Sequence, residues 1–225
     1  MPLKVWVALI AETAVFALLL FWPAGTLDWI QAWAMLGLFF GFAGAACFWL
    51  ARRDPALLEE RMRFPFQRGE PLWDSIGLLG LSLLFVGWLV LMALDAGRFH
   101  WSHMGAALNL AGAVGMALSF AFLQRVFREN TFLSPVVRLQ RERGHRVIST
   151  GPYALVRHPM YAGAAVLLVS MALLLGSWAG VAGALVITAG GALRAVAEER
   201  LLLRELPGYA DYAARVRWRL LPGVW

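Results

Sequence analysis

Polar side chains gather at two places in the second half of the chain, and each place borders a long apolar run. The first cluster is Gly151-Pro-Tyr-Ala-Leu-Val-Arg-His-Pro-Met-Tyr161, which ends where an apolar stretch begins. The second cluster, Arg194-Ala-Val-Ala-Glu-Glu199, stands where that stretch ends. Charged side chains at the depth of a membrane are costly unless something pairs with them. A hairpin between the clusters would bring both to one side of the bilayer, which predicts a binding or catalytic site there.

The local sequence makes the first cluster an ordered loop and gives the second a helical face. Pro152 and Pro159 lack a backbone donor and restrict the residues before them. Arg194 and Glu198 are four residues apart, so a helix places them on one face. Each polar group also has an ordinary interpretation, as a headgroup anchor, part of an aromatic belt or a helical salt bridge. Their convergence at one membrane face nevertheless favours a site.

The composition indicates a membrane protein. The chain has 225 residues, of which 60% are hydrophobic and only 15% are charged, whereas charged residues make up about a quarter of a soluble domain. Eleven Trp and fourteen Phe fit aromatic belts at two interfaces. The net charge of +6 comes from basic residues that lie between apolar runs. We therefore expect them to face anionic lipid, and we expect no nucleic-acid partner. Cys47 is the single cysteine, so no internal disulfide can form.

Apolar runs define the predicted spans. Four of them are long enough to cross a hydrocarbon core of roughly 30 Å. These runs are Val5–Trp22, Trp29–Leu50, Ser75–Leu94 and Met104–Leu123. A fifth stretch, Tyr161–Val196, is interrupted at Gly176-Ser177-Trp178. Each of its arms has about 16 residues, or about 24 Å of helix, which is slightly short for a full span.

We therefore predict an all-α, polytopic membrane helix bundle that forms a single integral membrane domain over residues 1–225. Residues 1–123 would supply four spans, and residues 124–225 would hold the site, with a helical hairpin over 161–196. A short amphipathic helix is expected to begin at Asp54-Pro55. A second helix is expected from Glu198 to Val216, with a break at Pro207-Gly208.

Arginine distribution predicts the orientation in the membrane. Arginines fill the segments 51–73 and 124–160 and the stretch after Val196, whereas the loops 23–28 and 95–103 hold only Arg98. The excess of Lys and Arg on cytoplasmic loops then places both termini in the cytoplasm.

Motifs for several other chemistries are missing from the sequence. It contains no G-x-G-x-x-G after a strand, no P-loop and no H-E-x-x-H. His100 and His103 lie on the predicted outer side with only Asp95 near them, so we expect no metal site. Glu12 is a lone acid in the first span, where it would face either the bundle interior or a lipid headgroup.

The polar clusters resemble a known enzyme family. Gly151-Pro-Tyr and Arg157-His-Pro-x-Tyr161-x-Gly163, followed by Arg194-x3-Glu198-Glu199 and Gly208-Tyr-x2-Tyr212, resemble the isoprenylcysteine carboxyl methyltransferases. Phospholipid methyltransferases share the first half of this pattern. The upstream stretch, Asn130-Thr-Phe to Gln140-x4-His145-Arg-Val-Ile-x2-Gly151, is similar to bacterial members of the family.

The resemblance implies S-adenosylmethionine as the methyl donor, held in a cytoplasm-facing cavity under the hairpin, so that 124–225 is a cofactor-binding region. The residues that match cofactor-lining positions of the family are His145, Arg146, Val147, Ile148, Tyr153, His158, Pro159, Met160, Tyr161 and Glu198. Gln140 joins them if a short gap is allowed. Arg194 matches a residue that orients the substrate carboxylate, and Arg194 and Arg157 are the predicted catalytic residues.

The acceptor is expected to be a lipophilic small molecule or a lipidated group, met within the membrane lipid. In the family's eukaryotic members it is prenylated cysteine. The short hydrophilic segments and compact size of this chain resemble a bacterial-type member in the inner (cell) membrane, whose acceptor is a carboxylate, a thiol or an amine. The sequence carries no signal for an oligomeric state.

Two alternatives remain open at the level of sequence. The first is an NADPH-dependent sterol-type reductase, whose loop also contains Arg-His-x-x-Tyr. Such chains usually place an acidic residue after the glycine, whereas Ala164 follows Gly163 here, and Pro159 occupies the third loop position. The second is a non-catalytic membrane protein or small transporter, which would need polar groups near the middle of several spans. Apart from Glu12, the spans nearly lack them.

Overall fold

The structure is a computed structural model that describes residues 3–62 and 71–225, and within these residues it consists of helices and loops. The helices are α1 (Leu3–Ala24), α2 (Ile30–Arg53), α3 (Pro55–Met62), α4 (Leu72–Met92), α5 (Ala106–Glu129), α6 (Pro159–Leu175), α7 (Trp178–Glu205) and α8 (Tyr209–Arg215). A π-helical turn, η1 (Ala93–Phe99), continues α4, and two 3₁₀ turns, η2 (Arg141–Arg143) and η3 (Gly151–Ala154), lie between α5 and α6. The prediction of an all-α polytopic bundle is confirmed. Arg63 and Arg68 of the predicted basic segment lie outside the described residues.

Five helices of the described chain are long and apolar enough to cross a membrane: α1, α2, α4 with η1, α5 and α7. The first four correspond to the four predicted spans. The expectation of two short hairpin arms was right for α6 and wrong for α7. Helix α6 has 17 residues, or about 26 Å, whereas α7 has 28 residues, or about 42 Å. Helix α7 is longer because its backbone continues beyond the apolar run into the polar region that holds Arg194 and Glu198.

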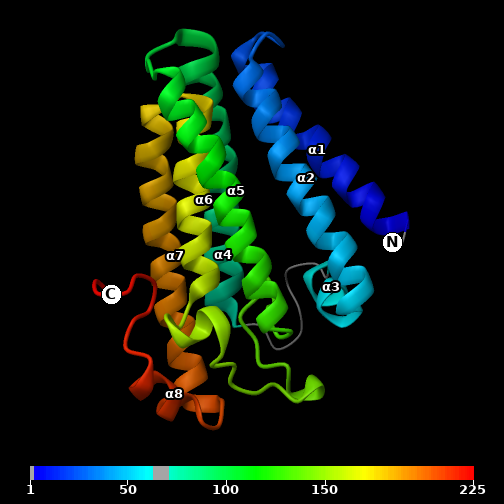
Figure 1. Cartoon of the computed structure of the whole chain (residues 1–225), viewed down its shortest axis with the longest axis vertical. Coiled ribbons are helices and arrows are strands. Elements are labelled where there is room, and N and C mark those ends of the chain that lie inside the picture. Colours follow the sequence, from blue (N-terminus) through cyan, green and yellow to red (C-terminus); the bar gives the residue numbers. More distant parts are fainter. Residues whose placement is uncertain (1–2, 63–70) are drawn as a thin grey trace.

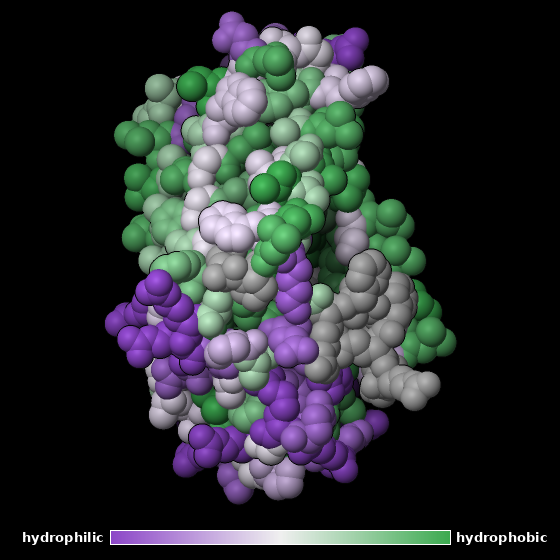
Figure 2. All heavy atoms as spheres, turned by 90° about the vertical axis from the view of Figure 1, so that its right-hand side faces the viewer, coloured by the Kyte–Doolittle hydropathy of each residue, from purple (hydrophilic) through white to green (hydrophobic). Residues whose placement is uncertain are grey.

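The helices alternate in direction, so the chain returns repeatedly to the same two ends of the bundle (Figure 1). One end carries the α1–α2 loop, η1 and the α6–α7 turn. The other end carries α3, the segment 130–158 and α8, and the start of α1 and the C-terminus of the chain lie toward it. In Figure 2, apolar side chains cover most of the height of the visible face, and polar ones gather at the α8 end. We call this polar end the site end.

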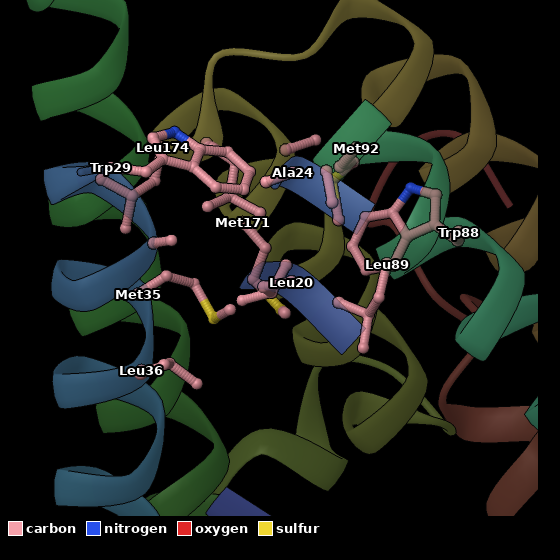
Figure 3. Packing of buried hydrophobic residues seen from close by; sticks show 14 of the residues in the cluster. Leu20, Ala24, Trp29, Met35, Leu36, Trp88, Leu89, Met92, Met171 and Leu174 are labelled. Carbon is pink, nitrogen blue, oxygen red and sulfur yellow. The ribbon is translucent and has the colours of Figure 1, made fainter. Parts of the chain in front are cut away.

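Side chains from α1, α2, α4 and α6 make up most of the main core, as Figure 3 shows, and Met116 of α5 and Ala184 and Ile187 of α7 also belong to it. Leu20, Met35, Leu89 and Met92 have no exposed surface. The indole of Trp88 donates a hydrogen bond of 2.7 Å to the carbonyl of Gly180, which ties α4 to α7. The core thus joins the N-terminal helices to the hairpin.

A close approach of α5 to α6 fixes the hairpin against the bundle. A Cβ atom on Gly112 would lie 2.3 Å from the backbone nitrogen of Leu174 and 2.7 Å from the carbonyl oxygen of Ser170. Both atoms belong to the backbone and cannot move aside, so only glycine fits at this crossing.

Asp95 fixes the far end of the hairpin. Its buried carboxylate accepts hydrogen bonds from the hydroxyls of Ser177 (2.5 Å) and Ser102 (2.7 Å). Ser177 in turn caps α7 by accepting from the backbone nitrogen of Gly180 at 2.7 Å. His100 directs its Nδ1 to the carbonyl of Ala96 at 2.8 Å. Asp95 therefore stabilises the turn, and the part of the chain that the structure describes holds no group of three potential metal ligands.

The two helices predicted at the site end are present. Helix α3 begins at Pro55, with the Asp54 carboxylate accepting from the backbone nitrogen of Leu57 at 3.0 Å. Helix α7 ends at Glu205, and α8 starts after Gly208, whose φ of 80° a residue with a side chain rarely adopts. The break returns α8 under the end of α7.

Candidate functional site

A cavity of about 290 Å³ lies at the site end, bounded by the segment 130–148, the start of α6, the end of α7 and α8. Its volume is at the lower limit of typical ligand pockets. Most of the predicted site residues line it: His145, Arg146, Val147, Ile148, Tyr153, Arg157, His158, Met160, Tyr161, Arg194 and Glu198. We call this space the polar cavity.

Gln140 and Pro159 are not among the lining residues. Gln140 has no exposed surface, and its side-chain amide donates to the carbonyl of Phe132 at 2.7 Å, so it holds the shape of the segment before η2. Pro159 is buried as the first residue of α6, where the missing N–H is tolerated.

Arg194 is held by a partner that sequence reasoning did not identify. Its Nε lies 2.7 Å from Oδ1 of Asp74, and its Nη2 lies 3.1 Å from Oδ2, so the pair is a two-point contact. Nη2 also donates to the carbonyl of Pro135 (2.8 Å), and Nη1 donates to the hydroxyl of Tyr161 (3.1 Å). A guanidinium has five N–H donors, so the described residues leave one, on Nη1, without an acceptor. A two-point contact between Arg194 and a substrate carboxylate would therefore require the hydrogen bonds between Arg194 and Asp74 to break.

Asp74 is fully buried in the first turn of α4 and 120 residues from Arg194. It also accepts from the backbone nitrogen of Val137 at 2.6 Å, so one carboxylate joins α4, α7 and the cavity wall. The only hint in the sequence was an isolated acid at the start of an apolar run, a position where a charge needs a partner.

Tyr161 connects Arg194 to Glu198. Its hydroxyl accepts from Arg194 and donates to Oε2 of Glu198 at 2.9 Å. The two residues on the helical face are therefore bridged by a tyrosine rather than paired directly. The other carboxylate oxygen of Glu198 has no hydrogen bond from a described residue, and Glu198 lines the polar cavity. This oxygen is free to accept hydrogen bonds from a ligand.

Arg157 forms a second buried network, with Glu199 at its centre. Arg157 donates from Nε and Nη2 to the two oxygens of Glu199, each at 3.1 Å. Its Nη1 donates to the carbonyls of Val216 (2.6 Å) and Arg217 (2.9 Å). His158 (3.3 Å) and Arg219 (3.1 Å) also approach Oε2 of Glu199.

This network ties the 151–158 loop to α7 and to the C-terminal tail. Two backbone bonds of 2.9 Å support it, from Arg157 to Trp218 and from His158 to Arg219. The partners of Arg157 are thus a carboxylate and backbone carbonyls, which suits a residue that positions the loop. The sequence placed Glu199 in the second cluster but gave no sign that it would meet Arg157.

Aromatic side chains form one wall of the polar cavity. The hydroxyl of Tyr212 donates to the carbonyl of Tyr153 at 2.8 Å, and Asn130 donates to the Tyr153 hydroxyl at 2.9 Å. The Tyr209 side chain is 4% exposed, and its hydroxyl has no hydrogen-bond partner among the described residues. Burial raises the pKa of Tyr209, so the phenol stays neutral and can donate. A buried hydroxyl without a partner in a cavity wall is suited to a ligand.

His145 contributes a neutral ring to the lining of the polar cavity. It stacks on Phe132 with ring centroids 4.7 Å apart, and its Nδ1 accepts from the backbone nitrogen of Gln140 at 3.3 Å. Burial, followed by the charge of Arg143, lowers the pKa of His145. The backbone N–H groups of Arg146, Val147 and Ile148 donate to no described residue and add further free donors beside this ring.

A second, larger cavity of about 1070 Å³ lies between α1, α2, α3 and the last turns of α5. Its walls are mainly apolar and include Leu9, Phe39, Phe42 and Phe127. Glu12, the lone acid of the first span, lines it as well. We call this space the apolar groove. Arg61 and Met160 line both the groove and the polar cavity.

Comparison with known families supports a membrane methyltransferase. The family model described as "Phospholipid methyltransferase" matches residues 101–206, just under half of the chain. The match contains α5, the 130–158 segment, α6 and α7, and therefore most of the polar cavity, whereas α1, α2, α3 and α4 lie outside it. A comparison with curated proteins gives no match.

Proposed function

We propose that this protein transfers the methyl group of S-adenosylmethionine to a lipophilic acceptor at the cytoplasmic face of a bacterial inner membrane. The acceptor group is a carboxylate, as in isoprenylcysteine-type O-methylation. The observation that carries the proposal is the junction of a polar cavity with an apolar groove, inside the region that matches a methyltransferase family.

The groups around the polar cavity fit the donor's chemistry. S-adenosylmethionine presents an ammonium and ribose hydroxyls, which suit the free carboxylate oxygen of Glu198. Its carboxylate and adenine offer acceptors for the unpartnered Tyr209 hydroxyl and the free N–H groups of residues 146–148. Phe132 and His145 give an aromatic wall for the base. When bound, the donor supplies a methyl group on a sulfonium, and the sulfur keeps the bonding pair as the acceptor oxygen forms the new C–O bond.

The protein's own contribution is positioning and exclusion of water. An in-line displacement gains most from holding the two reactants in contact and from a dehydrated nucleophile. The Asp74–Arg194 and Arg157–Glu199 pairs hold α7 and the 151–158 loop in place around the polar cavity. Met160 lies between the polar cavity and the apolar groove. A carboxylate acceptor needs no proton removed, so no general base is required.

The proposed orientation places the site end, with both termini, in the cytoplasm. Arginines concentrate at this end, and the donor is a cytoplasmic metabolite. Residues 1–225 then act as one membrane domain, in which α1 to α4 shape the acceptor side and 124–225 holds the cofactor.

Thermal unfolding of the purified protein tests this proposal against the alternatives. A ligand that binds only the folded state stabilises it by RT ln(1 + [L]/Kd) and so raises the unfolding temperature. S-adenosylhomocysteine should raise it, whereas NADPH should leave it unchanged. Stabilisation by NADPH alone would favour a reductase, and a response to neither would favour a protein without either activity.

A further inference from the structure

Arg61 is a cation at the site end that lacks a counter-charge among the described residues. It lies in the last turn of α3, and its Cζ is 4.7 Å from the ring centroid of Phe127. No hydrogen bond or ion pair joins its guanidinium to another described side chain. The neighbouring Glu60 is already paired with Arg138 at 2.9 Å. Burial lowers the pKa of Arg61, yet a guanidinium stays charged in proteins. Arg61 is partly buried, and a partly desolvated charge without a counter-charge favours binding of an anion.

Arg61 lies where the polar cavity and the apolar groove join, so the anion it can bind is the head of a lipid in the groove. Arg61 and Met160 are the two described residues that line both cavities. A lipid chain in the apolar groove would have its head at this junction, and a donor in the polar cavity would approach from the other side. Arg53 and Arg125, in contrast, are exposed, and Arg61 alone of these three reaches the polar cavity.

Arg194 is not available to bind the anionic group of a lipid. Its two-point contact is with Asp74, and its remaining donors go to Pro135 and Tyr161 except for one N–H. Arg157 is likewise occupied by Glu199 and by backbone carbonyls. Of the other arginines that line the polar cavity, Arg138 pairs with Glu60 and Glu142, and Arg146 is exposed to solvent. Arg61 is therefore the partly buried arginine at the groove whose guanidinium meets no carboxylate of a described residue.

We propose that Arg61 binds the anionic group of the lipophilic acceptor and positions its nucleophile at the mouth of the polar cavity. The anion is a carboxylate, which is itself the nucleophile; a phosphodiester is the other anion that the same guanidinium could bind, and the test below separates the two. The assignment of a lipid to the groove rests on the proposed function. The role of Arg61 as its anion-binding residue is independent of which donor the polar cavity holds.

Native mass spectrometry of the detergent-purified protein tests this role with named lipids. Oleate and dioleoyl phosphatidylethanolamine carry the two candidate anions, and oleyl alcohol and diolein are their uncharged counterparts. The wild type should retain at least one of the two lipids that carry an anionic group about tenfold or more above its counterpart, as expected for a charge-assisted hydrogen bond. Oleate preference would identify the carboxylate, and preference for the phospholipid would identify the phosphodiester.

Variants separate charge recognition from a structural role. Arg61→Gln should abolish the preference, Arg61→Lys should keep most of it, and Arg53→Gln, at an exposed site on α2, should behave as the wild type. Equal retention of charged and uncharged lipids by the wild type, or an undiminished preference in folded Arg61→Gln, would overturn the inference. The wild-type comparison decides the matter even if Arg61→Gln fails to fold. S-adenosylhomocysteine affinity, measured in parallel, should change less than a few-fold in Arg61→Gln. If the wild type does not bind S-adenosylhomocysteine, the proposed methyl donor is rejected, whereas the conclusion about lipid binding by Arg61 is unaffected.

Discussion

Replacing Asp74 by Asn should expose how strongly the cavity depends on one buried carboxylate. Asp74 is fully buried, and its two oxygens accept from Nε and Nη2 of Arg194 and from the backbone of Val137. The substitution keeps the shape but removes the counter-charge, and it turns one acceptor into a donor that faces other donors. Breaking a buried pair from one side costs about 3–5 kcal/mol. Arg194 is 15% exposed and keeps Tyr161 and Pro135 as partners, so we expect about 3 kcal/mol.

Chemical unfolding in detergent, followed by circular dichroism, measures this loss, and calorimetry with S-adenosylhomocysteine measures the effect on the site. Asp74→Asn should also weaken binding, because Val137 and Tyr161 in the cavity wall lose their anchor. Asp211→Asn, at an exposed position of α8, is the control and should stay within about 0.5 kcal/mol. A double variant that replaces both Asp74 and Arg194 by apolar residues should cost less than the sum of the single changes. An Asp74→Asn protein as stable as the control would refute the reasoning.

Three further changes test the packing, the electrostatics and the ligand contacts. Gly112→Ala should destabilise the protein by about 1–3 kcal/mol in chemical unfolding, because the new Cβ meets the α6 backbone. Gly41→Ala is the control and should not destabilise it, because a Cβ at Gly41 meets open space. Equal effects of the two substitutions would contradict the close approach of α5 to α6. His145→Asn should lessen the fall in unfolding temperature on acidification. Burial lowers the pKa of His145 from 6.5, so the unfolded state takes up a proton at a higher pH than the folded state does. The stability contributed by neutral His145 is therefore complete above pH 6.5 and is lost as the pH falls through the folded-state pKa. A pH dependence unchanged by the substitution would contradict this. Tyr209→Phe should leave unfolding nearly unchanged, because its hydroxyl has no partner among the described residues. It should nevertheless weaken S-adenosylhomocysteine binding by about 0.5–1.5 kcal/mol in calorimetry. Unaltered affinity would remove Tyr209 from the site.

The bundle could be predicted because its signals are local. Each long apolar run became a helix at nearly the expected bounds, and the Pro207-Gly208 break ended α7 where expected. The length of α7 was underestimated, because hydropathy marks where a helix leaves the apolar region, whereas the backbone hydrogen bonds that continue it do not depend on polarity. The loop 151–158 and the second cluster do meet across the polar cavity, as the hairpin geometry required.

The partners of the site residues could not be predicted, because pairing is a long-range property. Asp74 meets Arg194 across 120 residues, and nothing in the sequence around either residue selects the other. The same holds for Arg157 and Glu199, whose contact spans 42 residues. Residue type indicated that each arginine needed a partner, but only the packing of α4 against α7 determines whether that partner is a ligand or a carboxylate of the protein.

Methyl transfer from S-adenosylmethionine, labelled in its methyl group, into a bacterial lipid extract tests the central claim most directly. The purified protein should place label in an organic-soluble product, and Glu198→Ala should lower the incorporation sharply while the protein remains folded. A product that releases labelled methanol on mild base treatment would be an ester, as the carboxylate acceptor predicts. No incorporation above a heat-denatured control, across extracts from several bacteria, would contradict the account.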